Sequence, residues 1–369
     1  MYLEKILLKN YRNLKESLLE LNSNLNILVG YNGQGKTNFL ESIYLLGTGS
    51  SHRTGLDREL INWEEEKALI QVLLVRKDQN LKISILLDGS QKKIEINNTP
   101  IERVSELIGN LNVVLFSPED LNLVKGGPAN RRRFLDVEVS QVSSYYYYLL
   151  HKYNHVLKQR NNLLKDIRDG KGNKELLEIW DEKLVELGSK VILKRMEVVE
   201  KLKILARLTQ RRITNGVENL VIDYQPGLKG EIDRERVSLI FKQDLVNNRK
   251  IELERGYTLV GPHRDDLVFK INGVDVRKYG SQGQQRTTAL ALKLAELEFM
   301  KSETGEYPIL LLDDVFSELD ELRRSTLLRL IADKIQTFIT ATDLNNLKGI
   351  NEGSFHIFRV EEGEIYKEG

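Results

Sequence analysis

The sequence contains no cysteine, which excludes disulfide bonds and thiolate chemistry and fits the reducing cytoplasm. It also lacks any run of about 18 apolar residues, the length that a membrane-spanning helix needs. Its first residues are charged and alternate in polarity, so they predict neither a signal peptide nor an anchor. Its five histidines lie at positions 52, 151, 155, 263 and 356, without metal-ligand spacing. We therefore expect a cytoplasmic globular protein without a membrane association.

The near-neutral net charge of +1 conceals an uneven distribution. From Leu121 to Arg212 there are 20 Lys and Arg against 11 Asp and Glu, a balance of +9, so the remainder carries −8. A basic section indicates an anionic partner such as nucleic acid. Helices with lysine-rich surfaces give the same pattern, and charge alone leaves both interpretations open.

A glycine-rich stretch matches the phosphate-binding pattern G-x-x-x-x-G-K-[ST] at every fixed position. A short apolar run precedes it and a helical pattern follows it, as in a strand–loop–helix unit. The glycines allow backbone N–H groups to surround phosphates at a helix N-terminus, the lysine reaches the β- and γ-phosphates, and the threonine hydroxyl binds Mg²⁺. The predicted ATP-binding residues of this phosphate-binding loop are Gly30, Tyr31, Asn32, Gly33, Gln34, Gly35, Lys36, Thr37 and Asn38.

A second motif supplies the acidic groups that such a loop requires. Four apolar residues, a predicted buried strand, end in Asp313 and Asp314. Asp313 is the expected Mg²⁺ ligand together with Thr37, and Asp314 is expected to orient or deprotonate the attacking water. The predicted catalytic residues are therefore Asp314, Lys36 and Asp313.

Lys36 and Asp313 are 277 residues apart, so the chain makes a long excursion between the two halves of the site. Strand patterns over 68–75, 81–87 and 93–97 predict an antiparallel meander before it. Helical patterns then flank a turn at 169–173 and predict a helical hairpin. We expect an α/β head formed by residues 1–125 and 258–369, with a helical arm or lid inserted at 126–257. Three consecutive basic residues near the base of the arm, Arg131, Arg132 and Arg133, are suited to DNA phosphates.

The ordered set of motifs resembles the ABC-type P-loop ATPases of the SMC class, and within it the RecF family of bacterial recombination mediators. The stretches that carry the resemblance span the chain: GYNGQGKT, GSSHRTGLDREL, LFSPEDL, GPHRDDL, YGSQGQQRTTALALKLAE and ILLLDD. The short arm agrees with this family, because SMC proteins themselves have coiled coils hundreds of residues long.

The resemblance implies further roles. The ABC signature matches Ser281, Gln282, Gly283 and Gln284, which in that family contact the ATP held by the other subunit of a head-to-tail homodimer. The D-loop at the same interface matches 317–320, and Arg53 matches an arginine near the phosphates or the DNA. The implied function is ATP-dependent binding of double-stranded DNA at gaps or single-strand junctions during recombinational repair. The implied protein partners are RecO and RecR.

Three departures from the family pattern bear on catalysis. The usual Asp-Glu pair is Asp313-Asp314 here, which predicts slow hydrolysis. Ser117-Pro118-Glu119 replaces the Q-loop glutamine, and Thr340 or Thr342 takes the place of the switch histidine. Two other functions remain open at this point: a transport-type ABC ATPase, and a nucleotide-regulated repair scaffold without DNA binding of its own.

Overall fold

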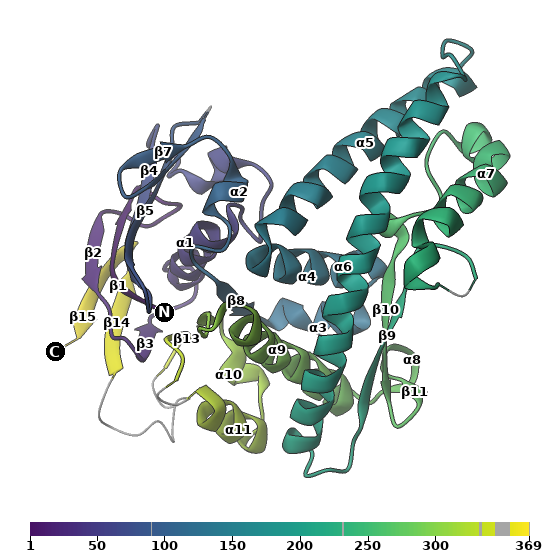
Figure 1. Cartoon of the computed structure of the whole chain (residues 1–369). Helices are drawn as coiled ribbons and strands as arrows, with labels where there is room; N and C mark the ends of the chain where they lie inside the picture. Colours follow the sequence, from purple (N-terminus) through teal and green to yellow (C-terminus); the bar gives the residue numbers. More distant parts are fainter. Residues whose placement is uncertain (90, 231, 332–333, 344–354, 369) are drawn as a thin grey trace. The chain divides into compact units, whose positions relative to one another are not determined.

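The computed structural model describes residues 1–368 except 90, 231, 332–333 and 344–354; the side chains of residues 317, 318, 321, 322 and 330 also lie outside the description. The chain forms two compact units. Met1–Asp120 and Lys293–Gly369 make the first unit, and Leu121–Leu292 make the second (Figure 1). Both ends of the chain therefore contribute to the first unit.

One sheet of the first unit is antiparallel, with the strand order β2-β1-β4-β5-β6-β7. Alternate residues of β4 and β5 are buried, the pattern of a sheet with one face on the core. The predicted meander is confirmed. The strands are β1 (Tyr2–Lys9), β2 (Ser17–Glu20), β4 (Ala68–Val75), β5 (Asn80–Leu87), β6 (Lys92–Ile96) and β7 (Thr99–Ile101).

The other sheet of the first unit is mostly parallel, with the order β15-β14-β3-β13-β12-β8. All residues of β8, β12 and β13 are buried, as expected of parallel strands covered on both faces. Because β3, β13, β12 and β8 are parallel, their carboxyl ends meet at one edge. The strands are β3 (Leu25–Val29), β8 (Val113–Phe116), β12 (Ile309–Leu312), β13 (Thr337–Ala341), β14 (Phe355–Glu361) and β15 (Glu364–Glu368).

Helix α1 (Lys36–Thr48) contacts strands of both sheets: β5 in the first, and β8 and β13 in the second. Nearly all of its residues are buried, and one hydrophobic cluster joins it to the two sheets. The helix that follows the phosphate-binding loop is thus fixed in the core. The other helical segments of this unit are η1 (Asp57–Leu60), α2 (Val104–Leu107), η2 (Pro118–Asp120), α9 (Gln282–Thr304, which begins in the second unit), α10 (Val315–Glu318) and α11 (Glu321–Ile331).

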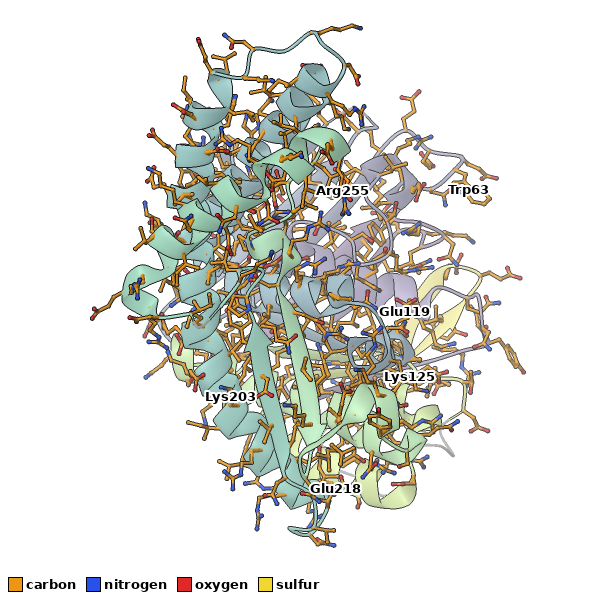
Figure 2. The ribbon with its side chains drawn as sticks, turned by 90° about the vertical axis from the view of Figure 1, so that its right-hand side faces the viewer. Trp63, Glu119, Lys125, Lys203, Glu218 and Arg255 are labelled. Atoms are coloured by element: carbon orange, nitrogen blue, oxygen red, sulfur yellow. The ribbon has the colours of Figure 1, made fainter. Side chains whose placement is uncertain are left out.

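The second unit contains the predicted helical hairpin. Helices α5 (Ser144–Arg168) and α6 (Leu176–Ile213) pack together, and α7 (Val237–Arg255) packs on both. At 1.5 Å per residue they are about 37 Å, 57 Å and 28 Å long. Charged side chains such as Arg255 cover their exposed faces (Figure 2). The shorter segments are α3 (Leu121–Lys125), α4 (Pro128–Val142), η3 (Arg234–Arg236), η4 (Pro262–Arg264) and α8 (Val276–Tyr279).

A three-stranded sheet of order β11-β10-β9 also belongs to the second unit. Strand β9 (Leu220–Gln225) pairs along its whole length with β10 (Asp266–Ile271), which continues into β11 (Val274–Asp275). This differs from the expected arm at 126–257, which had no strand and ended before the segment of β10. Since β9 follows α6 directly, its pairing with β10 keeps residues 258–292 with the helices, and the boundary lies at Leu292.

Two buried arginines join the hairpin to the segment before β10. The Arg160 guanidinium donates to Asp181 Oδ1 at 2.6 Å, to Glu252 Oε2 at 2.7 Å and to Thr258 Oγ1 at 2.7 Å. Arg195 donates to Asp265 Oδ2 and Asp136 Oδ1, each at 2.6 Å. Buried charges are tolerated only when paired and hydrogen-bonded in this way. The stretch GPHRDDL is therefore a polar anchor within the second unit.

Among the helices that the structure describes, none has an apolar stretch of the length that a bilayer crossing requires.

Candidate functional site

The phosphate-binding loop connects β3 to α1, as the motif predicts. Gly33 and Gly35 have φ of +82° and +122°, which only glycine adopts readily. A Cβ on Gly35 would lie 2.5 Å from Leu14 Cδ2, and one on Gly30 would lie 2.3 Å from the backbone oxygen of Val360. The three glycines are thus required by backbone conformation and by close packing.

Lys36 is the first residue of α1 and is 8% exposed. Its Nζ donates to the carbonyl oxygens of Gly30 at 2.6 Å and Tyr31 at 2.9 Å, so the ammonium group lies across the loop. Burial lowers the pKa of Lys36 below its ordinary value, and the charges of Asp314 and Asp313 oppose that shift. The lysine and both acidic residues therefore gather at one place.

Asp313 and Thr37 meet at the edge where the parallel strands end. Thr37 Oγ1 donates to Asp313 Oδ1 at 2.9 Å, and Thr340 Oγ1 donates to the same oxygen at 2.9 Å. Burial raises the pKa of the Asp313 carboxyl, while these two hydroxyls act in the opposite sense. Two neighbouring ligands of an octahedral Mg²⁺, each at about 2.1 Å, lie about 3 Å apart. The spacing and the oxygen donors fit this ion.

Asp314 has a left-handed backbone, with φ of 51° and ψ of 24°, which is uncommon for a residue other than glycine. Its N–H donates to Thr340 Oγ1 at 2.8 Å. Thr340 is 1% exposed, so one buried hydroxyl holds both aspartates, whereas Thr342 is exposed. Strained backbone of this kind concentrates at functional sites.

A second layer of polar contacts supports the loop. Asn13 Nδ2 donates to Gly33 O at 3.1 Å, and Asn38 Nδ2 donates to Asn13 Oδ1 at 2.7 Å. Arg53 NH1 donates to Asn38 Oδ1 at 2.7 Å, which brings the half-exposed Arg53 to the start of α1. The sequence did not identify Asn13, because nothing in its local context distinguishes it from a surface asparagine.

The sequence motifs also gave no indication of Glu41 in α1, a carboxylate that is completely buried. Arg12 donates to both of its oxygens, from Nε at 2.9 Å and from NH2 at 2.8 Å. Burial opposes ionisation, but the hydrogen bonds from Arg12 and Ser51 hold the pKa of Glu41 below its ordinary value. Arg12 thus joins the turn after β1, and Ser51 joins the 49–55 loop, to the helix behind the phosphate-binding loop.

The remaining loop residues are on the surface. Tyr31 is 80% exposed, Asn32 is exposed, and Gln34 accepts a hydrogen bond from the N–H of Glu362 at 2.6 Å. The expected D-loop includes Ser317 and Glu318, whose side chains lie outside the described residues.

The signature residues begin α9 in the second unit, where Ser281 and Gln284 form a reciprocal cap. Gln284 N donates to Ser281 Oγ at 3.2 Å, and Ser281 N donates to Gln284 Oε1 at 3.0 Å. This is a capping box, S-x-x-Q. Ser281 and Gln282 are exposed, and Gly283 is half-buried. Because Ser281 Oγ accepts in this cap, its hydroxyl hydrogen can point to an anion at the helix N-terminus.

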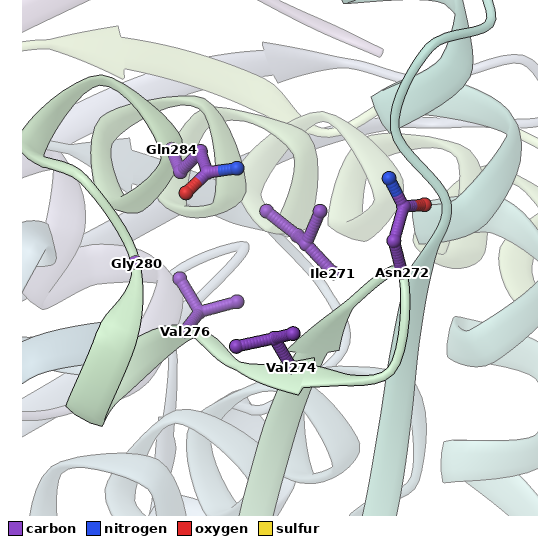
Figure 3. A pocket seen from close by; sticks show the side chains of 6 residues that line it. All are labelled: Ile271, Asn272, Val274, Val276, Gly280 and Gln284. Atoms are coloured by element: carbon purple, nitrogen blue, oxygen red, sulfur yellow. The ribbon is translucent and has the colours of Figure 1, made fainter.

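A small open pocket of ≈ 250 Å³ lies beside this helix start (Figure 3). The residues that line it are Ile271, Asn272, Val274, Val276, Gly280 and Gln284 (Figure 3). Gln284 Nε2 also donates to Glu218 Oε1 at 3.1 Å, so the signature is attached to the segment between α6 and β9.

The three predicted DNA-contacting arginines of α4 differ from one another. Arg131 is 2% exposed and donates to both carboxylate oxygens of Asp266, at 2.6 and 3.1 Å. The prediction that Arg131 contacts DNA is therefore wrong, because its guanidinium is buried in an ion pair within the second unit. Arg132 is half-buried and donates to the backbone oxygen of Asp265 at 2.8 Å, and Arg133 is exposed.

Comparison with known proteins identifies the family. The model of the RecF/RecN/SMC N terminal domain matches residues 2–365. The DNA replication and repair protein RecF of Halothermothrix orenii is 60% identical over 99% of this chain and 98% of the relative. RecF of Alkaliphilus oremlandii is 46% identical over 99% of this chain and 100% of the relative.

Solved structures agree with the sequence comparison. A structure of the recombination mediator protein RecF-ATP in the RecFOR pathway has a TM-score of 0.91 at 39% identity, covering 100% of this chain and 98% of that chain. An Smc head domain from Pyrococcus furiosus has a TM-score of 0.55 at 16% identity, covering 100% of this chain and 96% of that chain. This similarity shows a shared fold. The resemblance predicted from the motifs is confirmed, and the chain belongs to the RecF family of DNA replication and repair proteins, with the ABC-type ATPase head of the SMC class.

Proposed function

We propose that this chain is an ATP-dependent DNA-binding protein of recombinational repair and of gap repair during replication. ATP binding drives head-to-tail homodimerisation around duplex DNA, and slow hydrolysis releases it. The observation that carries the proposal is the assembled cluster of Lys36, Thr37, Asp313 and Asp314, together with a capped and exposed signature at Ser281. The similarity to a RecF solved with ATP supports ATP as the nucleotide.

In this proposal the phosphate-binding loop holds the triphosphate of ATP. Lys36 exchanges its contacts with the carbonyls of Gly30 and Tyr31 for the β- and γ-phosphate oxygens. Thr37 and Asp313 would hold Mg²⁺, which when bound neutralises phosphate charge. Arg53, attached to Asn38 at the start of α1, is assigned to the phosphate side of the site.

Asp314 is the group that orients the attacking water. Its carboxylate is one methylene shorter than the glutamate usual at this position in ABC ATPases, and general-base catalysis depends on hydrogen-bond reach. The proposed hydrolysis is therefore slow, and the ATP-bound dimer is long-lived.

Residues Ser281 to Gln284 are assigned to the γ-phosphate held by the partner protomer. A hydroxyl and the N-terminus of α9, a helix of 23 residues, form an anion-binding arrangement. Contacts that form only in the ATP-bound dimer supply the differential affinity that a nucleotide switch requires.

Duplex DNA is assigned to the basic section from Leu121 to Arg212, with Arg132 and Arg133 as phosphate contacts. Single-strand gaps or junctions are the proposed sites of action, with RecO and RecR as protein partners, and the cytoplasm is the proposed location. The RecFOR pathway of the similar RecF structure supports the choice of partners.

The test measures mass in solution and duplex binding with and without ATP. We expect ATP to dimerise the wild type but not Lys36→Met or Ser281→Arg. Ser302→Arg, the same change at an exposed position late in α9, is the matched control and is expected to dimerise. Normal dimerisation of Ser281→Arg contradicts the clamp. Dimerisation without duplex binding favours a nucleotide-regulated scaffold instead.

A further inference from the structure

Two large apolar side chains of the first unit project into solvent on either side of η1. Trp63, which is labelled in Figure 2, is 93% exposed. Leu56 is 64% exposed. A tryptophan side chain carries up to about 250 Å² of surface, and leaving it in water forfeits a large hydrophobic stabilisation. Trp is also the residue type most enriched among binding hot spots.

The backbone that presents Trp63 is ordered by hydrogen bonds. Asn62 N donates to Asn10 O at 2.9 Å, which attaches the segment to the end of β1. Glu65 N donates to Asn62 O at 3.1 Å, and Glu64 N donates to Asn62 Oδ1 at 3.0 Å, so Trp63 occupies a hydrogen-bonded turn. The indole is therefore held outward by a defined turn, and little backbone entropy is lost when a partner binds it.

The surroundings of Trp63 are acidic. Glu64, Glu65 and Glu66 follow it directly, and all three are exposed. From Asp57 to Lys67 there are five acidic residues, one arginine and one lysine, a local charge of −3, and Lys92 forms an ion pair with Asp57 at 3.0 Å. Among the described residues, no cation forms an ion pair with Glu64, Glu65 or Glu66. DNA and anionic lipid are repelled by such a surface, whereas a protein surface with Lys and Arg around an apolar hollow is attracted.

We propose that Leu56 and Trp63, with Glu64–Glu66, form a docking site for a basic surface of a protein partner. The indole ring is the buried anchor, and the glutamates form the charged rim that selects the partner. The choice of repair proteins as partners rests on the proposed function. The docking itself needs neither ATP nor DNA, because every residue involved lies outside the nucleotide cluster.

The sequence provides a direct reporter, because Trp63 and Trp180 are its two tryptophans. In Trp180→Phe the fluorine resonance of incorporated fluorotryptophan reports on Trp63 alone, whatever tryptophans the partner contains. Purified RecR and purified RecO are added separately, without nucleotide or DNA. We expect one of them to shift the resonance in a saturable way, and duplex DNA to leave it unchanged.

Calorimetry then measures the affinity of the chain for whichever of RecR and RecO shifts the resonance. Trp63→Ala is expected to weaken binding at least tenfold, whereas Trp180→Phe leaves it unchanged. The double change Glu64→Lys, Glu66→Lys is expected to weaken binding and reduce its dependence on salt. The matched control is Asp78→Lys, Glu102→Lys, which changes the net charge equally at two other exposed positions of the first unit.

The docking site is refuted if neither RecR nor RecO shifts the resonance, if Trp63→Ala binds as tightly as the wild type, or if duplex DNA produces the shift. Failure of ATP-driven dimerisation leaves these measurements unaffected, so the two proposals fail separately.

Discussion

Thr340 gives the sharpest test of how the two aspartates are positioned. Its buried hydroxyl donates to Asp313 Oδ1 at 2.9 Å and accepts from Asp314 N at 2.8 Å. Thr340→Val preserves the shape but removes both contacts, the one accepted from the Asp314 N–H and the one donated to the Asp313 carboxylate. A hydrogen bond to a charged group contributes about 1.5 to 3 kcal/mol, so we expect ATP hydrolysis to fall about 10- to 100-fold.

The pH profile distinguishes this role from a general loss of structure. Burial already raises the pKa of Asp313, and the Thr340 hydroxyl is one of the groups that opposes the rise. Without that hydroxyl the carboxyl ionises at higher pH, and only the carboxylate binds Mg²⁺. The acidic limb of the rate profile is therefore expected to move to higher pH, and half-maximal activity is expected to need more Mg²⁺.

The assay is steady-state phosphate release at several pH values and Mg²⁺ concentrations, with ATP binding and thermal unfolding measured in parallel. Thr340→Ser keeps the hydroxyl and should restore the rate. Thr342→Val makes the same change at an exposed position two residues away and should have no effect. A Thr340→Val protein that hydrolyses ATP like the wild type across the whole Mg²⁺ and pH range refutes the reasoning.

Three further changes test other parts of the structure. Burial lowers the pKa of His263 to about 4, whereas the ordinary value is 6.5. The neutral histidine therefore contributes its full stability to the fold above pH 6.5, and this contribution is lost as the pH falls towards 4. In denaturant titrations, the free energy of unfolding of the wild type relative to His263→Gln should be about 3 kcal/mol smaller at pH 4 than above pH 6.5. Gly30→Ala forces a Cβ against the backbone of β14 and should lower ATP affinity at least tenfold by calorimetry, whereas Gly55→Ala, where a Cβ meets nothing within 4 Å, should bind normally. Arg160→Met removes the cation paired with the fully buried Glu252 and one of the two arginines paired with Asp181, and it should cost about 3 to 5 kcal/mol in denaturant unfolding. Arg255→Met on the surface of α7 should cost little.

The sequence predicted best where local pattern and local structure coincide. The phosphate-binding loop, the meander and the helical hairpin each depend on neighbouring residues, and the observed ends of β4 (Ala68–Val75) match the prediction at both residues. The cluster of Lys36 with Asp313 was also predictable, because each motif has a fixed place at the carboxyl edge of a parallel sheet.

The features that escaped prediction depend on contacts between distant residues. Arg131 resembles its two basic neighbours in sequence, but it is buried in an ion pair with Asp266, 135 residues away. Strand β9 is separated from β10 by α7, so the pairing that moves the domain boundary has no local signal. Thr340 and Thr342 were equivalent by position. The register that places Ile339 beside Leu312 brings Thr340 to the aspartates and distinguishes the two threonines.

The division of the chain has a consequence for the proposed switch. Lys36, Asp313 and Asp314 belong to the first unit, whereas Ser281 belongs to the same compact unit as the basic hairpin of α5 and α6. The hydrogen bond from Gln284 to Glu218 connects the signature to the end of α6, and the pairing of β9 with β10 continues that connection. In the proposed dimer, ATP on the first unit of one protomer therefore acts on the arm-bearing unit of its partner. Glu218→Ala, which removes the acceptor of this hydrogen bond but leaves Ser281 to Gln284 unchanged, should leave ATP-driven dimerisation largely intact while weakening duplex binding. If the variant lost ATP-driven dimerisation and duplex binding to the same extent, the coupling would not pass from the signature to the arm through this hydrogen bond.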